Sequence, residues 1–166
     1  MSKWTSVRPA GLALATLTAL ATQALAPQAA ALVEIAASPA RVSAAPGATV
    51  ALFVDGMPRQ NIHVYAPGAT DYVPITLTVA AVTGVAVRPL KYPASETLIF
   101  DGGAVPVFQK PFRLIQEVVL ASTFKPNDVV ALHGTVDYQA CDNKVCFKPV
   151  SVPVSWTIDV KKAGGK

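Results

Sequence analysis

The fold of this chain is decided by residues 130–160, which read VALHGTVDYQACDNKVCFKPVSVPVSWTIDV. Apolar side chains recur at every second residue on both sides of a central segment. They are Val130, Leu132, Val136 and Tyr138 before it, and Val150, Val152, Val154, Trp156, Ile158 and Val160 after it. A period of two is typical of a strand with one buried face. We therefore predict a β-hairpin with strands at 130–138 and 150–160, and Trp156 in the core.

The central segment holds the only two cysteines of the chain, Cys141 and Cys146. Asp142 and Asn143 lie between them and favour a turn, which predicts the cysteines at the tip of the hairpin. A bond between them closes a short loop, and the loop-entropy model gives it only about 2 kcal/mol. The short loop also predicts that both sulfurs lie near solvent, where a partner thiolate could attack them. The spacing alone is compatible with a structural disulfide that fastens the hairpin and with a redox pair that exchanges with a partner.

The rest of the chain has the pattern of short strands separated by turns. Six further strands are expected at 32–37, 49–55, 62–65, 75–79, 85–90 and 112–120. Residues 38–47 and 93–106 are expected to be connections, and residues 56–58 (Gly-Met-Pro) to end a strand. Fourteen prolines and ten glycines argue against helices. The fold class predicted is all-β, an antiparallel two-sheet sandwich.

The N-terminal residues have the layout of a secretory signal peptide. Lys3 and Arg8 precede an uncharged run at 9–31, and three alanines at 29–31 offer a small-x-small cleavage site. We expect a signal peptide at 1–31, a domain at 32–160 and a disordered tail at 161–166. A retained anchor helix is the alternative, but prolines and alanines make this run a poor membrane span. Export would bring the cysteines into an oxidising compartment, where they can form a bond.

Charge and motifs exclude several classes of function. The net charge is +4, and without Lys3 and Arg8 the chain keeps 12 basic and 10 acidic residues, which are scattered. This balance gives no argument for nucleic-acid binding. The sequence has no phosphate loop, no Gly-x-Ser-x-Gly motif and no convincing carboxylate pair.

Metal binding has weak support in the sequence. The two cysteines have no partner pair at zinc spacing. A soft copper site built from Cys141, Cys146, His133 or Met57 is possible in principle. His133 falls on the face opposite Leu132 and is better explained as a solvated strand residue. We expect no cofactor.

The pattern around the cysteines resembles a known family. The segment from Tyr138-Gln139 through Cys141 and Cys146 to Pro149, and on to Trp156, looks like the N-terminal periplasmic domain of the thiol:disulfide interchange protein DsbD. Residues 63–68 and 92–108 are also similar to it. The resemblance implies an immunoglobulin-like sandwich in the periplasm. It also implies transfer of electrons to periplasmic disulfide isomerases and cytochrome c maturation thioredoxins.

The resemblance also implies roles for individual residues. Cys146 corresponds to the cysteine that forms mixed disulfides with partners, and Cys141 to the resolving one. His63 and Tyr65 correspond to aromatic residues beside the pair. The counterpart of the family's cap loop is 96–103, with Phe100 as the aromatic that shields the disulfide.

One departure from the family affects the source of electrons. The sequence matches neither the membrane domain nor the terminal thioredoxin-like domain of DsbD. We therefore expect either that separate proteins, such as a DsbD-like membrane donor, supply the electrons, or that the domain has another use. The function expected is a periplasmic dithiol/disulfide carrier that serves thioredoxin-like proteins. The alternative is a non-enzymatic sandwich that binds another protein and uses its disulfide only to fasten the hairpin.

Overall fold

A computed structural model describes residues 31–100 and 103–162, and this part of the chain is built from strands and loops alone. The strands are β1 (Val33–Ser38), β2 (Arg41–Ala44), β3 (Thr49–Pro58), β4 (His63–Tyr65), β5 (Thr76–Val79), β6 (Val85–Val87), β7 (Glu96–Phe100), β8 (Gly103–Phe108), β9 (Phe112–Leu120), β10 (Val129–Tyr138), β11 (Ala140–Cys141) and β12 (Val150–Val160). Nowhere in these two ranges is there a helix with the length and apolar character needed to cross a membrane.

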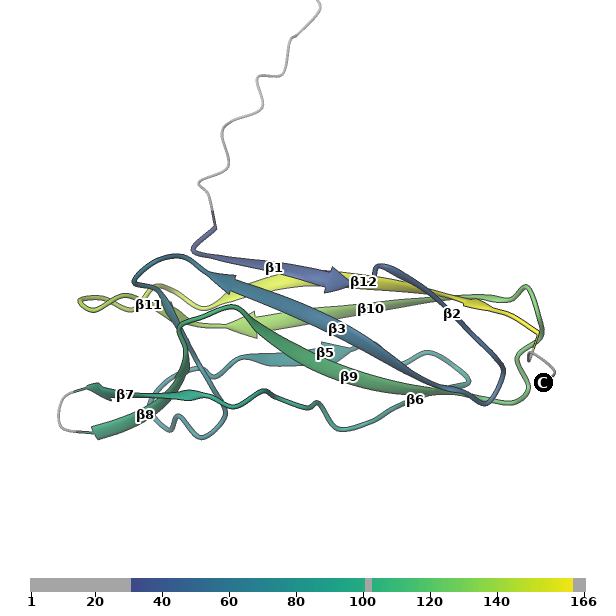
Figure 1. Ribbon diagram of the computed structural model, residues 1–166, viewed down its shortest axis with the longest axis horizontal. Coiled ribbons are helices and arrows are strands. Elements are labelled where there is room, and N and C mark those ends of the chain that lie inside the picture. The colour runs from purple at the N-terminus through teal and green to yellow at the C-terminus, as the bar shows by residue number, and fades with distance from the viewer. Residues whose placement is uncertain (1–30, 101–102, 163–166) are drawn as a thin grey trace, which may run out of the picture.

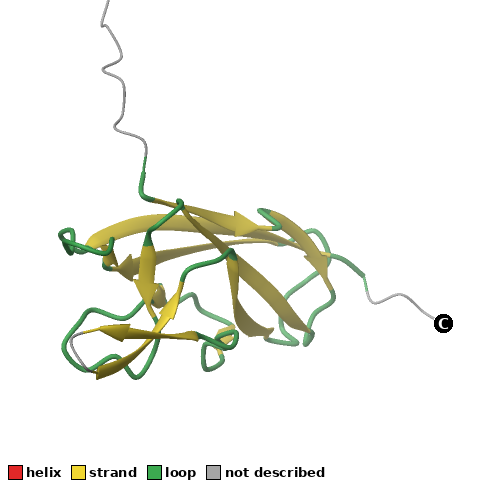
Figure 2. Cartoon of the chain, turned by 60° about the vertical axis from the view of Figure 1, so that its left-hand side comes forward, coloured by secondary structure: helices red, strands yellow, loops and turns green. Residues whose placement is uncertain are grey.

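The strands form three four-stranded sheets. Two of them, with orders β1-β3-β9-β6 and β2-β12-β10-β5, contain the long strands and run along the molecule as two layers (Figure 1). The third, β11-β4-β8-β7, lies at one end, and its β7–β8 hairpin projects from the body in both views (Figures 1 and 2). Neighbouring strands pair antiparallel except β12 and β2, which pair parallel. The predicted all-β sandwich is confirmed for the described residues.

The core lies between the two long sheets. Alternate residues of β3 and β9 face alternate residues of β10 and β12, as period-two strands require. Trp156 is the largest of the fully buried side chains, and its indole N–H donates to the carbonyl of Phe53 in the opposite sheet at 3.3 Å. The Tyr138 hydroxyl likewise donates to the Val33 carbonyl at 3.4 Å. These bonds satisfy polar atoms that burial would otherwise leave unpaired.

Four strands were missed by the sequence pattern. The connection expected at 38–47 contains β2, which pairs with β12 and is fastened by two hydrogen bonds of 2.7 Å from the Arg41 guanidinium to Asp159. The irregular segment expected at 93–106 contains β7 and the start of β8. The fourth is β11, within the cysteine loop. β2 has four residues and β11 two, which is too short to establish a period, while β7 and β8 belong to the small third sheet, in which the burial of β8 does not alternate.

The expected strand end at residues 56–58 is also wrong. β3 continues to Pro58 because β1 pairs along its outer side, with Val33 opposite Pro58 and Ile35 opposite Gly56. On its other side Gly56 is paired with Phe112 of β9, and the Phe112 ring covers the glycine. A Cβ at position 56 would overlap this ring. Glycine is needed here for close approach and does not interrupt the strand.

We predict that Gly56→Ala lowers the free energy of unfolding by about 1–3 kcal/mol, because the new methyl group displaces the Phe112 ring from its site. Urea denaturation measures the loss. The matched control is the same substitution in a Phe112→Leu background, where the added cost should be smaller. Equal costs in the two backgrounds would show that the ring is not the obstacle.

Candidate functional site

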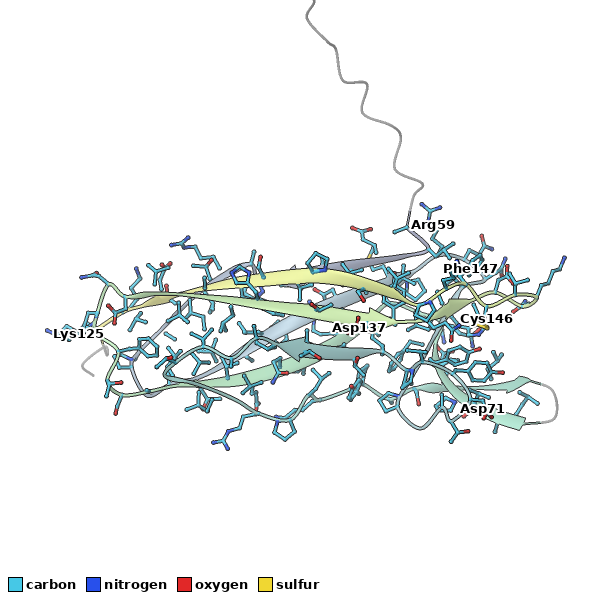
Figure 3. All side chains as sticks on the ribbon, turned by 180° about the vertical axis from the view of Figure 1, so that it is seen from behind. Arg59, Asp71, Lys125, Asp137, Cys146 and Phe147 are labelled. Carbon is cyan, nitrogen blue, oxygen red and sulfur yellow. A yellow bond between two sulfur atoms is a disulfide. The ribbon has the colours of Figure 1, made fainter. Side chains whose placement is uncertain are left out.

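The cysteine loop is an excursion between the two paired strands of the predicted hairpin. β10 and β12 stay in register up to Tyr138 opposite Val150, and residues 139–149 extend beyond that last pair. The first part of the excursion, β11, leaves this sheet and pairs with β4, which places Cys141 opposite His63. Figure 3 shows Cys146 at the end of the molecule from which the β7–β8 hairpin also projects. The site is therefore assembled on the small third sheet.

The two cysteines are joined by a disulfide, but their surroundings differ. The S–S distance is 2.08 Å and the Cα atoms are 4.1 Å apart. Cys141 is 1% exposed, whereas Cys146 is exposed. The prediction that both sulfurs lie near solvent is wrong for Cys141. Pairing with β4 draws this residue into a small apolar cluster with Tyr65 and Val107.

Tyr65 contacts the exposed cysteine. Its hydroxyl oxygen lies 3.4 Å from the Cys146 Sγ, and the hydroxyl must be the donor because a disulfide sulfur carries no hydrogen. Tyr72 stacks on Tyr65 with ring centroids 4.0 Å apart and planes 10° apart. Burial, and then the neighbouring Tyr72, raise the pKa of Tyr65 to about 12. Tyr65 therefore keeps its proton at neutral pH and can donate it in a hydrogen bond to sulfur.

His63 lies in β4 opposite Cys141 and is 4% exposed. Its ring meets the Tyr65 ring edge-on, with centroids 5.4 Å apart and planes at 85°. Burial lowers the pKa of His63 from its usual value of 6.5, and the charge of Asp142 only partly opposes this shift. His63 is therefore an uncharged aromatic neighbour of the disulfide at neutral pH.

Two residues at the site escaped the sequence analysis as functional candidates. Tyr72 is one, and no periodicity connects it with Tyr65, since a turn separates the two. Gln139 is the other, although it belongs to the Tyr-Gln-x-Cys pattern that carries the family resemblance. Its amide N–H donates to the Phe147 carbonyl at 3.0 Å, and its amide oxygen accepts from the Val73 N–H at 3.4 Å. Gln139 thus ties both arms of the cysteine loop to the segment that bears Tyr72.

The segment expected to be a cap loop is mostly regular structure. Residues 96–100 form β7 and pair with β8, with Phe100 opposite Gly103. The Phe100 side chain and residues 101–102 lie outside the part of the chain that the structure describes. The role of Phe100 as a shield therefore stays a prediction. Ile99, next to it in β7, is 70% exposed.

The residues weighed for a copper site do not form a cluster of ligands. Over 31–100 and 103–162 no group of three or more His, Cys, Asp or Glu side chains is placed to hold a metal ion. His133 is exposed in β10, where it pairs with Ser155 of β12, and both cysteine sulfurs are used in the disulfide.

Comparison with known proteins gives a likeness of fold only. No protein-family model and no curated protein matches the chain. Solved structures that resemble it include the reduced N-terminal domain of DsbD from Neisseria meningitidis, with 14% identity, a TM-score of 0.45, and coverage of 70% of this chain and 82% of that one. Another is the N-terminal periplasmic domain of ScsB from Proteus mirabilis, with 14% identity, a TM-score of 0.47, and coverage of 77% of this chain and 45% of that one.

A glycoside hydrolase of family 123 from Clostridium perfringens also resembles the chain, with 7% identity, a TM-score of 0.39, and coverage of 77% of this chain and 27% of that one. The first structure is the domain that the sequence resemblance named. At such identities and TM-scores, however, none of the three carries an argument about activity.

The buried His63 predicts a pH dependence of stability. Its folded-state pKa lies below 6.5, so the unfolded chain binds more protons. The stabilisation from neutral His63 is therefore complete above pH 6.5 and is lost as the pH falls toward the folded-state pKa. When the pH falls from 7.5 to 5, the free energy of unfolding should decrease less in the His63→Phe variant than in the unsubstituted protein. Urea denaturation at the two pH values measures this difference, and parallel losses would contradict the assignment.

Proposed function

We propose that this chain is a dithiol/disulfide carrier that exchanges electrons with thioredoxin-like proteins through Cys141 and Cys146. The observation that carries the proposal is the asymmetry of the disulfide. Cys146 is an exposed residue that a visiting thiolate can approach, while Cys141 is buried in the apolar cluster of the third sheet. Exchange through a mixed disulfide needs one sulfur that the partner can reach and a second sulfur held nearby.

The difference in exposure between the two cysteines supports the following order of bond changes. A partner thiolate attacks the Cys146 Sγ, the Cys141–Cys146 bond breaks, and Cys141 leaves with the electron pair and takes up a proton. The second thiolate of the partner then attacks the partner sulfur in the mixed disulfide, and Cys146 leaves with the electron pair and takes up a proton. Two electrons and two protons then reside on the carrier, and the partner leaves oxidised. In the opposite direction reduced Cys146 attacks a partner disulfide, and Cys141 resolves the intermediate.

Tyr65 supports the charged form of Cys146 in either direction. Its hydroxyl is already 3.4 Å from this sulfur in the disulfide form. A hydrogen bond to an ionised acceptor is about twice as strong as one to a neutral acceptor. The same contact therefore strengthens when Cys146 becomes a thiolate.

The location and partners complete the proposal. Residues 1–31 would direct export to the periplasm, where thioredoxin-like proteins would be the partners and a DsbD-like membrane protein the donor. The domain would then span 32–160, with 161–166 as a tail. Phe100, at the end of β7, would shield the disulfide until a partner docks. The support for these points is the sequence resemblance together with the position of β7 at the cysteine end of the molecule.

The asymmetry predicts different reactivities in the reduced protein. We expect Cys146 to be alkylated faster than Cys141 by on the order of tenfold, because a buried thiol is inert compared with an exposed one. Limited treatment with iodoacetamide followed by peptide mass spectrometry measures the ratio. Equal modification of the two thiols would contradict the proposed division of roles.

Trapping tests the exchange itself. The Cys141→Ala variant should accumulate a mixed disulfide between Cys146 and a thioredoxin-like protein, because the resolving sulfur is missing. Cys146→Ala, which keeps the buried sulfur, should trap little. Mixed disulfides are measured on non-reducing gels followed by mass spectrometry.

Redox equilibration distinguishes the carrier from the structural alternative. A reduction potential of the Cys141–Cys146 disulfide below about −300 mV, with no trapping by either variant, would identify a purely structural disulfide in a protein-binding sandwich. It would overturn the proposed carrier function.

A further inference from the structure

The cysteine loop is closed by hydrogen bonds that do not involve sulfur. The Asp142 carboxylate oxygen Oδ1 accepts the N–H of Lys144 at 2.7 Å and that of Val145 at 2.8 Å. The Asp142 N–H donates to the Val145 carbonyl at 3.0 Å, and the Phe147 N–H donates to the Ala140 carbonyl at 2.9 Å. These four bonds form a small hairpin within the excursion, and its two arms carry the two cysteines.

The two arms are anchored very differently. Cys141 is fixed by pairing with β4 and by burial in the apolar cluster. Residues 143–146 are exposed, and the arm that carries Cys146 is anchored at Phe147, which packs partly buried against the core. The sulfur bond, the contact with Tyr65 and the turn bonds of Asp142 also hold this arm in place. When the sulfur bond opens, the turn at Asp142 constrains the chain before Cys146, and the bonds and packing of Phe147 constrain it after Cys146.

We propose that Asp142 is a positioning residue that keeps Cys146 beside Cys141 after the disulfide is reduced. The inference rests on the proposed carrier function and extends it to the reduced state. A turn that survives reduction holds the two thiols at a high effective concentration, so little chain entropy is lost when the bond forms again. Asp142 thereby favours the disulfide form and speeds attack by Cys141 on a mixed disulfide at Cys146.

The charge state of Asp142 agrees with this role. The backbone N–H groups of Val145 and Lys144 are the largest causes that hold the pKa of Asp142 below its usual value. The carboxylate is ionised at neutral pH and accepts both bonds. Its charge also acts on its surroundings, so the experiment must separate geometry from charge. Asparagine keeps an acceptor oxygen at the same place and removes the charge.

Equilibration with glutathione provides the test. Two glutathione thiols reduce the protein disulfide: the Cys141–Cys146 bond breaks, one glutathione disulfide forms, and two protons pass to the cysteine thiols. We expect Asp142→Ala to lower the equilibrium constant for forming the protein disulfide about fivefold or more, since the reduced loop gains freedom. Asp142→Asn should stay within about twofold of the unsubstituted protein, as should Asn143→Ala, the matched control at the exposed neighbouring position.

Two outcomes of the glutathione equilibration would overturn the role of Asp142. An unchanged constant in Asp142→Ala would show that the turn is not needed, and equal losses in the alanine and asparagine variants would assign the effect to charge. Hydrogen exchange of the reduced, unsubstituted protein gives a measurement free of folding defects. The Lys144 and Val145 amides should remain protected, and loss of their protection on reduction would also overturn the proposal. Because no partner protein takes part, a failure here is distinct from a failure of trapping.

Discussion

The site depends on the register between β10 and β12, which ends with Tyr138 opposite Val150. That register is fixed because a slip by one residue would turn the inward face of each strand, including Trp156, toward solvent. With the pair fixed, the eleven residues 139–149 must leave the sheet at one end. They leave beside β4, whose edge is available for β11. The core of the sandwich thus determines where the cysteines lie, although neither sulfur lies between the two long sheets.

The environment of the disulfide is aromatic and mostly uncharged. Tyr65 keeps its proton because its pKa is about 12, and His63 is neutral because burial lowers its pKa. Thiol exchangers that place a sulfur at a helix N-terminus gain a more stable thiolate from the dipole. Cys146 lies instead in a strand-and-turn segment, with a tyrosine hydroxyl as its neighbour. In the proposed carrier such a sulfur should react slowly with random disulfides, so docking of a partner would have more influence on the rate.

The sequence predicted the parts of the structure in which burial alternates strongly. β9, β10 and β12 each have one face in the core, so their residues repeat with a period of two and their bounds were nearly right. β4 contributes three buried residues in a row, because both of its faces are covered. The cysteines and Tyr65 could be named from residue type and family pattern. The stacking of Tyr72 and the burial of Cys141 could not, since both result from the third sheet, whose strands β7, β8 and β11 carry no clear period.

If the chain is the proposed carrier, its fold must be stable in both redox states, and the core and the cysteine loop would then have different roles. A carrier must remain folded with its bond open, so its stability cannot depend on that bond. Here the bond closes a short loop and contributes only about 2 kcal/mol in the loop-entropy model. Burying one large core side chain such as Trp156 contributes more, because removing such a side chain costs about 3–5 kcal/mol. In the proposed carrier the sandwich would therefore maintain the third sheet and Cys141, and the change on reduction would be confined to the exposed arm that carries Cys146.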